Sequence, residues 1–256
     1  MHQESSLRAE DPSYLEEISD SAFEHAAINK LSVYAISRAE PLLSSAMHRA
    51  FSLQYQVVKR SFDVILSLIL LVIFLPLGLL VGLLVLCTSR GPMFYRHERI
   101  GRFGVPFKII KFRSMYTGSR KAEVLDIRQA HRCAPSGFRA DKRDLDPRIT
   151  PIGRIMRKLS LDELPQLFNV LLGDMSLVGP RPIVEAERPI YGRNMTFYEL
   201  LQPGITGLWQ VSGRSDVGYN QRISLDREYA GRWSCFLDIR ILARTIPAVI
   251  SMRGAY

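Results

Sequence analysis

The sequence VILSLILLVIFLPLGLLVGLLVLCTS, residues Val64–Ser89, contains 26 residues without a single charge and is dominated by Leu, Ile and Val. At about 1.5 Å per residue, a helix of this length measures roughly 39 Å, which exceeds the ~30 Å hydrocarbon core of a bilayer. The alternative is a buried core helix, but a soluble chain of 256 residues rarely encloses so long an apolar run. The stretch therefore predicts a helix inserted in a membrane.

Pro76 stands at the middle of this apolar run. A proline inside a helix removes one backbone hydrogen bond and kinks the helix. Because Lys and Arg favour the cytoplasmic side of a membrane, positive flanks at both ends favour a helix that enters and leaves by the same face. We therefore predict a re-entrant helix broken at Pro76, with a spanning helix as the alternative. The flanking cations are Lys59, Arg60, Arg90, Arg96, Arg99 and Arg102.

The charge of the chain is unevenly distributed. The whole sequence carries a net charge of +9, yet residues 1–58 contain four Lys/Arg against eight Asp/Glu. The basic remainder suits anionic partners such as phospholipid headgroups, nucleotides and diphosphates. Nucleic acid is another anion, but the membrane run and the lack of a basic-aromatic motif argue against it. Three widely spaced cysteines, without a C-x-x-C pair or zinc spacing, fit a reducing, cytosol-facing environment.

The membrane run divides the chain into three expected regions. Residues 1–55 are expected to form an N-terminal extension that is poorly ordered or binds a partner. Residues 56–90 would hold an interfacial lead-in and the re-entrant helix, and residues 91–256 a cytoplasmic catalytic domain. Within this domain, Met93–Arg99 and Pro106–Phe112 show some alternation on either side of two glycines, which predicts a β-hairpin.

The rest of the chain is expected to be helices and loops. The last two expected helices look amphipathic and suit a membrane interface. The prediction is therefore an α+β, mostly helical, monotopic membrane protein with a re-entrant helix, a small β-hairpin and interfacial amphipathic helices. The expected helices are Ile152–Leu159, Leu164–Leu172, Leu225–Trp233 and Leu237–Met252, and the expected loops are Gly173–Pro182 and Gln202–Arg214. Thr117–Pro147 is expected to be either a long loop or a loose helix.

Asp162 and Glu163, in the sequence SLDELP (160–165), are the first candidates for chemistry. Ser160 and Glu163 also match a helix capping box, so a purely structural role is the alternative. Carboxylates near cations and a helix N-terminus stay ionised, as a nucleophile or a metal ligand must, and the helix terminus would attract a diphosphate. The nearby cations are Arg148, Arg154, Arg157 and Lys158.

Five basic residues are candidates for binding phosphate. Lys111 and Arg113 should face one side of a strand, with Phe112 facing the other. Arg181 lies between two prolines that fix its direction, and Arg214 follows a glycine. A guanidinium can bind a phosphate through two donors at once. The alternatives are a turn arginine paired with an acid and, for the strand, an edge facing solvent or lipid headgroups. The full set is Lys111, Arg113, Arg157, Arg181 and Arg214.

Six sequence blocks, in order, resemble the bacterial sugar transferases, also called monotopic phosphoglycosyl transferases. The resemblance covers the chain from about Val57 to the C-terminus, and it is specific because all six blocks occur together. It departs at the membrane break, where family members commonly have Ser-Pro and this chain has Leu75-Pro76. The kinking proline remains, but a hydroxyl able to bond the freed carbonyls is lost. The blocks are Lys59–Asp63, Lys111–Met115, Asp146–Thr150, Ser160–Gln166, Gly173–Pro182 and Pro203–Arg214.

The resemblance implies a site among membrane lipids on the cytoplasmic face of the bacterial inner membrane. It implies a UDP-sugar donor, undecaprenyl phosphate as acceptor, and Mg²⁺. It also implies that Asp162 is the nucleophile and that Glu163 assists with the metal or with a proton. The sequence is most similar in kind to members that load galactose-1-phosphate or glucose-1-phosphate for exopolysaccharides.

The prediction is thus an enzyme that transfers hexose-1-phosphate from a UDP-sugar to undecaprenyl phosphate, the first step of exopolysaccharide or other glycan assembly. The reaction would pass through a phosphosugar–aspartyl intermediate and release UMP. The alternative is a non-catalytic, membrane-anchored scaffold whose basic surface binds anionic lipid. Such a scaffold would tolerate replacement of Asp162 or Glu163. The sequence decides neither the sugar nor whether the chain forms a homo-oligomer.

Overall fold

The computed structural model describes residues 41–117, 148–213 and 217–250. The chain divides into a unit of Met1–Ser44 and a unit of Ser45–Tyr256, and the elements below belong to the second unit. It is α+β and mostly helical, with two small two-stranded sheets among the described residues.

The apolar run lies in α3, a helix of 36 residues from Leu53 to Thr88. Among the described residues, α3 is the one helix long and apolar enough to cross a membrane, and 11 % of its most apolar stretch is buried. Its exposed side chains are large and hydrophobic, among them Ile69, Val72 and Leu79. So large an exposed apolar surface marks contact with lipid or another apolar partner.

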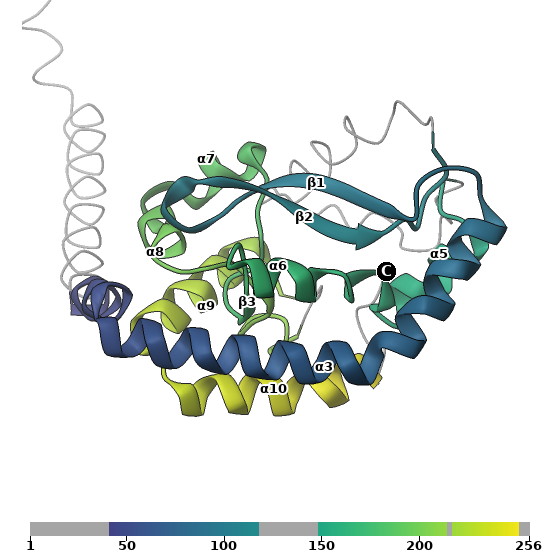
Figure 1. Ribbon diagram of the computed structural model, residues 1–256. Helices are drawn as coiled ribbons and strands as arrows, with labels where there is room; N and C mark the ends of the chain where they lie inside the picture. The colour runs from purple at the N-terminus through teal and green to yellow at the C-terminus, as the bar shows by residue number, and fades with distance from the viewer. Residues whose placement is uncertain (1–40, 118–147, 214–216, 251–256) are drawn as a thin grey trace, which may run out of the picture. The chain divides into compact units, whose positions relative to one another are not determined.

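The expected break at Pro76 is not a gap between two helices. α3 continues through Pro76, and Figure 1 shows that its last part turns away from the direction of the rest. Proline lacks only its own N–H donor, so one bond of the helical ladder is lost while the bonds on either side remain. The proline therefore bends the helix rather than ending it.

The predicted β-hairpin is confirmed. β1 (Phe94–Ile100) pairs antiparallel with β2 (Pro106–Phe112), and a short turn through Arg102–Gly104 joins them. In this turn Phe103 has a φ of 58° and Gly104 a φ of 74°. A positive φ is strained for residues that have a Cβ, so glycine at position 104 lowers the backbone strain of this tight turn.

The register decides which side chains of the hairpin share a face. Arg99 lies opposite Phe107, and Lys111 lies opposite Tyr95. Directly opposed residues point to the same side of a sheet, so both cations share a face. Phe112 points the other way and packs in a buried cluster with side chains of α3 and α5. The opposite directions expected for Lys111 and Phe112 are therefore present.

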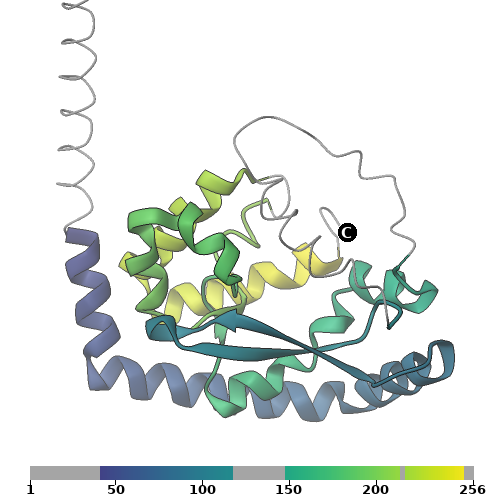
Figure 2. The same ribbon diagram turned by 90° about the horizontal axis from the view of Figure 1, so that it is seen from above.

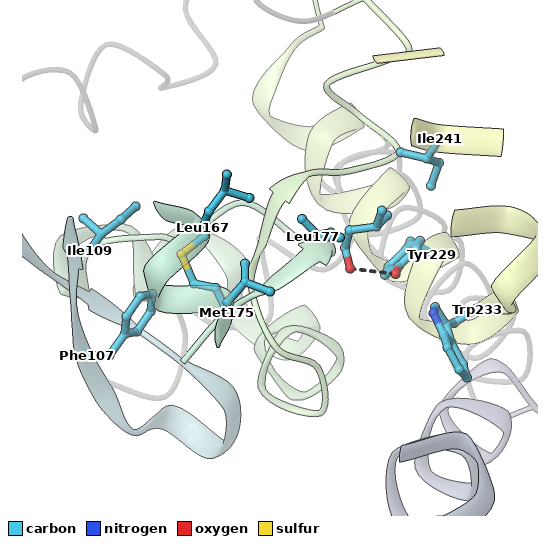
Figure 3. Close-up of a cluster of buried hydrophobic side chains, with 10 residues drawn as sticks. Phe107, Ile109, Leu167, Met175, Leu177, Tyr229, Trp233 and Ile241 are labelled. Atoms are coloured by element: carbon cyan, nitrogen blue, oxygen red, sulfur yellow. Dashed lines mark hydrogen bonds between the residues drawn. The ribbon is translucent and has the colours of Figure 1, made fainter. Parts of the chain in front are cut away.

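The helices after the hairpin are α5 (Pro151–Lys158) and α6 (Gln166–Leu172), separated by a 3-10 turn at Leu161–Glu163. Figures 1 and 2 both place α5 beside the last turns of α3. In Figure 1, α6 lies between the hairpin and α3. The core joins these layers, and Figure 3 shows part of it, with Phe107, Ile109, Leu167, Met175 and Leu177 all buried.

Two short strands were expected as loops. β3 (Ser176–Val178) pairs in parallel with β4 (Gly204–Thr206). Three residues are too few to show strand alternation, so the sequence gives no period to read. The backbones approach so closely here that a Cβ on Gly204 would overlap the backbone of Gly179. The glycines that suggested loops are thus needed for close strand packing.

In the described residues after β3, two short helices and two longer ones accompany β4. α7 (Arg188–Tyr191) and α8 (Met195–Glu199) precede α9 (Tyr219–Arg232) and α10 (Cys235–Ile250). α9 begins before the expected Leu225 and buries one of its faces. α10 carries exposed apolar side chains, including Phe236 and Ile246, and its place on a membrane interface stays a prediction. Two more 3-10 turns lie at Glu185–Glu187 and Gly192–Asn194.

A buried ion pair fixes the start of α3 to this C-terminal part. Lys59 Nζ lies 2.6 Å from Asp238 Oδ2 and donates to the carbonyl of Val178 at 3.0 Å. The Trp233 indole donates to the same carboxylate at 2.9 Å, and the Tyr229 hydroxyl lies 2.8 Å from its other oxygen. Asp238 is 1 % exposed. Lys59, expected as a flanking charge of the membrane run, therefore holds α3 against α10.

Arg60 has a similar structural task. Its guanidinium donates to the carbonyl oxygens of Val170 and Leu171, the latter at 2.6 Å. The last carbonyls of a helix have no partner within the helix, so Arg60 satisfies the end of α6. Both cations that precede the membrane run are thus engaged inside the protein.

Candidate active site

Asp162 and Glu163 lie on a turn between two helices rather than on a capped helix. Ser160 has a φ of 56°, in the left-handed region, and its side chain makes no cap hydrogen bond. The capping box requires an extended N-cap residue, so the box that the sequence suggested does not form. The two acids are instead presented by the 3-10 turn at Leu161–Glu163, with the glutamate free to bond elsewhere.

Glu163 is paired with Lys111. Its Oε1 lies 2.6 Å from Lys111 Nζ, which β2 carries on the pocket face of the hairpin. Burial alone would raise the pKa of Glu163, but the nearby charges of Lys111 and Arg181 outweigh it and the pKa is lowered. The cations therefore keep this carboxylate ionised, as the sequence suggested.

Asp162 behaves in the opposite way. Its side chain is 8 % exposed. Burial raises the pKa of Asp162, and the charge of Glu163 adds to that effect, although Lys111 and Arg157 partly offset it. A carboxylate with a raised pKa is a stronger base once ionised, which favours attack on an electrophile. Neighbouring acids with opposite shifts are typical of a catalytic pair.

Glu163 opens into a pocket that collects positive charge. The pocket brings together Lys111, Glu163 and Arg181, three of the residues predicted from the sequence, and adds Arg99. Three cations and one carboxylate line the pocket, so an anion such as a diphosphate would be favoured there. The Arg181 guanidinium also lies 6.0 Å from the centre of the Trp209 ring. The remaining lining residues are Ile109, Gln166, Pro182, Gly204, Ile205 and Gln210.

The structure places Arg113 apart from this group. β2 ends at Phe112, so the alternation that would put Arg113 beside Lys111 stops one residue earlier. The Arg113 guanidinium is buried and donates to the carbonyls of Ser89 at 2.7 Å and Arg90 at 3.0 Å. It therefore satisfies the end of α3. Its contact with phosphate stays a prediction.

Of the other two predicted cations, Arg157 and Arg214, only Arg157 lies among the described residues. Arg157 Nε donates to Ser114 Oγ at 2.9 Å, and the charge of Arg157 acts on Asp162. It thus lies near the proposed nucleophile. Arg214 falls outside the described residues.

Gly153 sets the position of Arg157. A Cβ on Gly153 would overlap the backbone carbonyl of Ser114, the residue whose hydroxyl accepts from Arg157. We expect Gly153→Ala to lower the free energy of unfolding by about 1–3 kcal/mol, because the backbone must shift to relieve the overlap. The control is Gly78→Ala in α3, where the added Cβ meets nothing within 4 Å. Thermal unfolding in detergent compares the two, and equal stabilities would contradict this packing.

The sequence reasoning missed three pocket residues. Arg99 was read only as a flanking charge, although the hairpin register would have placed it on the same face as Lys111. Gln166 and Gln210 lie inside recognised blocks but carry no charge, so residue type gave no signal. All three line the pocket that contains Glu163.

Comparison with known proteins adds independent findings. Residues 54–252 match the family model described as bacterial sugar transferase. The chain is 47 % identical, over 78 % of its length and 88 % of the relative's, to the exopolysaccharide production protein ExoY of Rhizobium meliloti. It is 47 % identical to an undecaprenyl-phosphate galactose phosphotransferase of Salmonella typhimurium, over 78 % of this chain and 42 % of the relative. It is 39 % identical to a UDP-glucose:undecaprenyl-phosphate glucose-1-phosphate transferase of Caulobacter vibrioides, over 77 % and 72 %.

Proposed function

The chain belongs to the bacterial sugar transferase family, and we propose that it transfers a hexose-1-phosphate from a UDP-sugar to undecaprenyl phosphate. It is an enzyme of the undecaprenyl-phosphate sugar phosphotransferase class. Relatives named for galactose and for glucose both match it, so either hexose is compatible with the proposal. The relative named for exopolysaccharide production supports the same pathway type.

The observation that carries this proposal is the contrast between two adjacent acids. Glu163 is held ionised at a pocket with Lys111, Arg181 and Arg99, while the neighbouring Asp162 is buried and has a raised pKa. The cations suit the diphosphate of the donor, and the buried acid suits nucleophilic attack.

The proposed reaction has two displacements at phosphorus. A carboxylate oxygen of Asp162 bonds to the sugar-bearing phosphorus, and the bridging P–O bond breaks so that UMP leaves with the electron pair. An oxygen of undecaprenyl phosphate then bonds to the same phosphorus, and the bond to Asp162 breaks. The product is undecaprenyl diphosphate-hexose, and Asp162 is again a free carboxylate. Splitting one displacement into two predicts ping-pong kinetics.

Mg²⁺ fits the donor set at this site. No group of three His, Cys, Asp or Glu side chains gathers among the described residues. Magnesium commonly binds through one or two carboxylates together with substrate phosphates, so Asp162 and Glu163 would be sufficient protein ligands. When bound, the ion would neutralise charge on the donor diphosphate.

The membrane helix supports the choice of a lipid acceptor. The phosphate group of a polyprenyl phosphate lies at the membrane interface. An enzyme that uses this lipid therefore needs its active site at the same depth in the membrane. α3 has the length and composition to hold the protein in a bilayer. A re-entrant α3 bent at Pro76 would leave the site on the cytoplasmic face of the inner membrane, where UDP-sugars are present.

The reaction class is tested by UMP release. Purified protein with Mg²⁺ and undecaprenyl phosphate should release UMP from UDP-galactose, from UDP-glucose or from both. Omitting undecaprenyl phosphate should stop continuous turnover. If a panel of nucleotide-sugars gives no UMP, the proposal fails and the scaffold alternative gains support.

The pH profile should show the raised pKa of Asp162. Asp162 attacks only when ionised, so kcat/KM should fall as the pH drops through that raised pKa, above the ordinary aspartate value of 3.8. Because Arg157 lowers this pKa, Arg157→Met should move the acid limb to higher pH. Arg154→Met, on the exposed side of α5, is the control and should leave the limb in place. If the acid limb of the Arg157→Met profile stays in place or moves to lower pH, the limb does not report the ionisation of Asp162.

A further inference from the structure

Asn169 joins α6 to the hairpin through both ends of its side-chain amide. Its Oδ1 accepts from the backbone N–H of Ile110 at 2.9 Å, and its Nδ2 donates to the carbonyl of Lys108 at 2.9 Å. These two backbone groups lie on either side of Ile109 in β2. The Nδ2 group also donates to Asp174 Oδ2 at 3.2 Å. The side chain of Asn169 thus bonds to β2 as a neighbouring strand would.

The surroundings of Asn169 fix it in place. Its side chain is 1 % exposed, and its backbone carbonyl accepts from the N–H groups of Gly173 and Asp174 at the end of α6. Ile109 of β2 packs in the same core cluster as Leu167 of α6, as Figure 3 shows. A buried amide that bonds two groups of one strand, next to such packing, holds the strand at one distance from the helix.

The two elements that Asn169 joins carry the two partners of the ion pair in the pocket. Lys111 follows Ile110 on β2, and Glu163 lies three residues before the first residue of α6. Lys111 Nζ lies 2.6 Å from Glu163 Oε1, and both residues line the pocket with Arg181. The separation of β2 from α6 therefore sets where the Lys111 ammonium lies in the pocket.

We propose that Asn169 is a positioning residue, which holds Lys111 at Glu163 and so places a cation for the anionic part of the donor. This proposal rests on the proposed function, because it takes the pocket to be the donor site. Asn169 acts through β2 and Lys111 and takes no part in the bond changes at phosphorus. Stabilisation of charge needs groups that are already in place, so a displaced ammonium would serve the reaction less well.

The first test is the variant Asn169→Leu in the full-length enzyme, which leaves the Ile110 N–H and the Lys108 carbonyl without their side-chain partner. We expect kcat/KM for the donor, measured as UMP release, to fall about ten- to a hundredfold. Asn220→Leu makes the same chemical change at an exposed position of α9 and should keep the wild-type value. If folded Asn169→Leu enzyme also keeps the wild-type kcat/KM, the proposal is overturned.

A double-mutant cycle shows whether Asn169 acts through Lys111 rather than through stability alone. In Lys111→Met enzyme, which lacks the ammonium group, Asn169→Leu should lower kcat/KM by less than about twofold. A merely structural loss would multiply in full with the loss caused by Lys111→Met, and that result would overturn the proposal. Should Asn169→Leu fail to fold, Asn169→Asp enters the same cycle, because its carboxylate keeps an acceptor for Ile110 and loses the donor.

A labelling experiment separates the failure of this proposal from the failure of the proposed function. If wild-type enzyme releases no UMP from any donor, the proposed function fails, and the pairing of Lys111 is then read without turnover. A lysine released from its ion pair reacts faster with an amine-acylating reagent, so Lys111 should be acylated several-fold faster in Asn169→Leu than in wild type. Lys59, which pairs with Asp238, is the internal reference and should react at an unchanged rate. An unchanged rate at Lys111, or an equal rise at both lysines, would overturn the proposal.

Discussion

Asp162→Asn should abolish transfer, with a loss of at least about 10³-fold in kcat, the scale seen when a nucleophile is removed from other enzymes. Asparagine has nearly the same shape as aspartate, but its amide oxygen is a poor nucleophile toward phosphorus. The measurement is UMP release from the preferred donor, with undecaprenyl phosphate present.

Two controls distinguish a loss of catalysis from a loss of folding. Because burial disfavours the charge on Asp162, the uncharged asparagine should not lower the unfolding temperature. Glu163→Gln removes the partner of Lys111 but leaves the nucleophile, so its loss should be smaller. If folded Asp162→Asn protein keeps activity within about tenfold of wild type, Asp162 is not the nucleophile.

Asp238→Ala should cause the largest loss of stability, about 3–5 kcal/mol, because it removes the nearer counter-charge of the largely buried Lys59 and leaves it only Asp63, 3.8 Å away. The same carboxylate accepts from Trp233 and lies beside the Tyr229 hydroxyl. The variant therefore loosens α3 from α9 and α10 together. Thermal unfolding in detergent, followed by circular dichroism, gives the change.

An exposed ion pair provides the matched control. Glu228 and Arg232 lie 2.7 Å apart on α9, with side chains 44 % and 69 % exposed, so Glu228→Ala should cost less than about 1 kcal/mol. If Asp238→Ala and Glu228→Ala lower the stability equally, the ion pair of Lys59 with Asp238 does not hold α3 against α10.

Features set by local periodicity could be predicted from the sequence. The apolar run became α3, and the alternating segments around the turn became the hairpin. The acids and several of the cations were found because charge and spacing mark them in the sequence. Lys111, Glu163 and Arg181 were proposed separately and share one pocket.

Features that depend on tertiary contacts could not be predicted in this way. Charge alone does not show that Lys59 pairs with Asp238 or that Arg113 satisfies the end of α3. The capping box failed because Ser160 has a left-handed backbone, which the residue pattern does not reveal. Gln166 and Gln210 drew no notice because a neutral side chain carries no charge signal, and only the fold shows that both line the pocket.

The proposed mechanism depends on Asp162 carrying the phosphosugar, and trapping the intermediate tests this step. Enzyme would be mixed with UDP-galactose or UDP-glucose and Mg²⁺ without undecaprenyl phosphate, then quenched, digested and analysed by mass spectrometry. We expect a burst of UMP that does not exceed the amount of enzyme, and a hexose phosphate on the peptide that contains Asp162. UMP released only when acceptor is present, with no modified peptide, would contradict it and favour direct transfer.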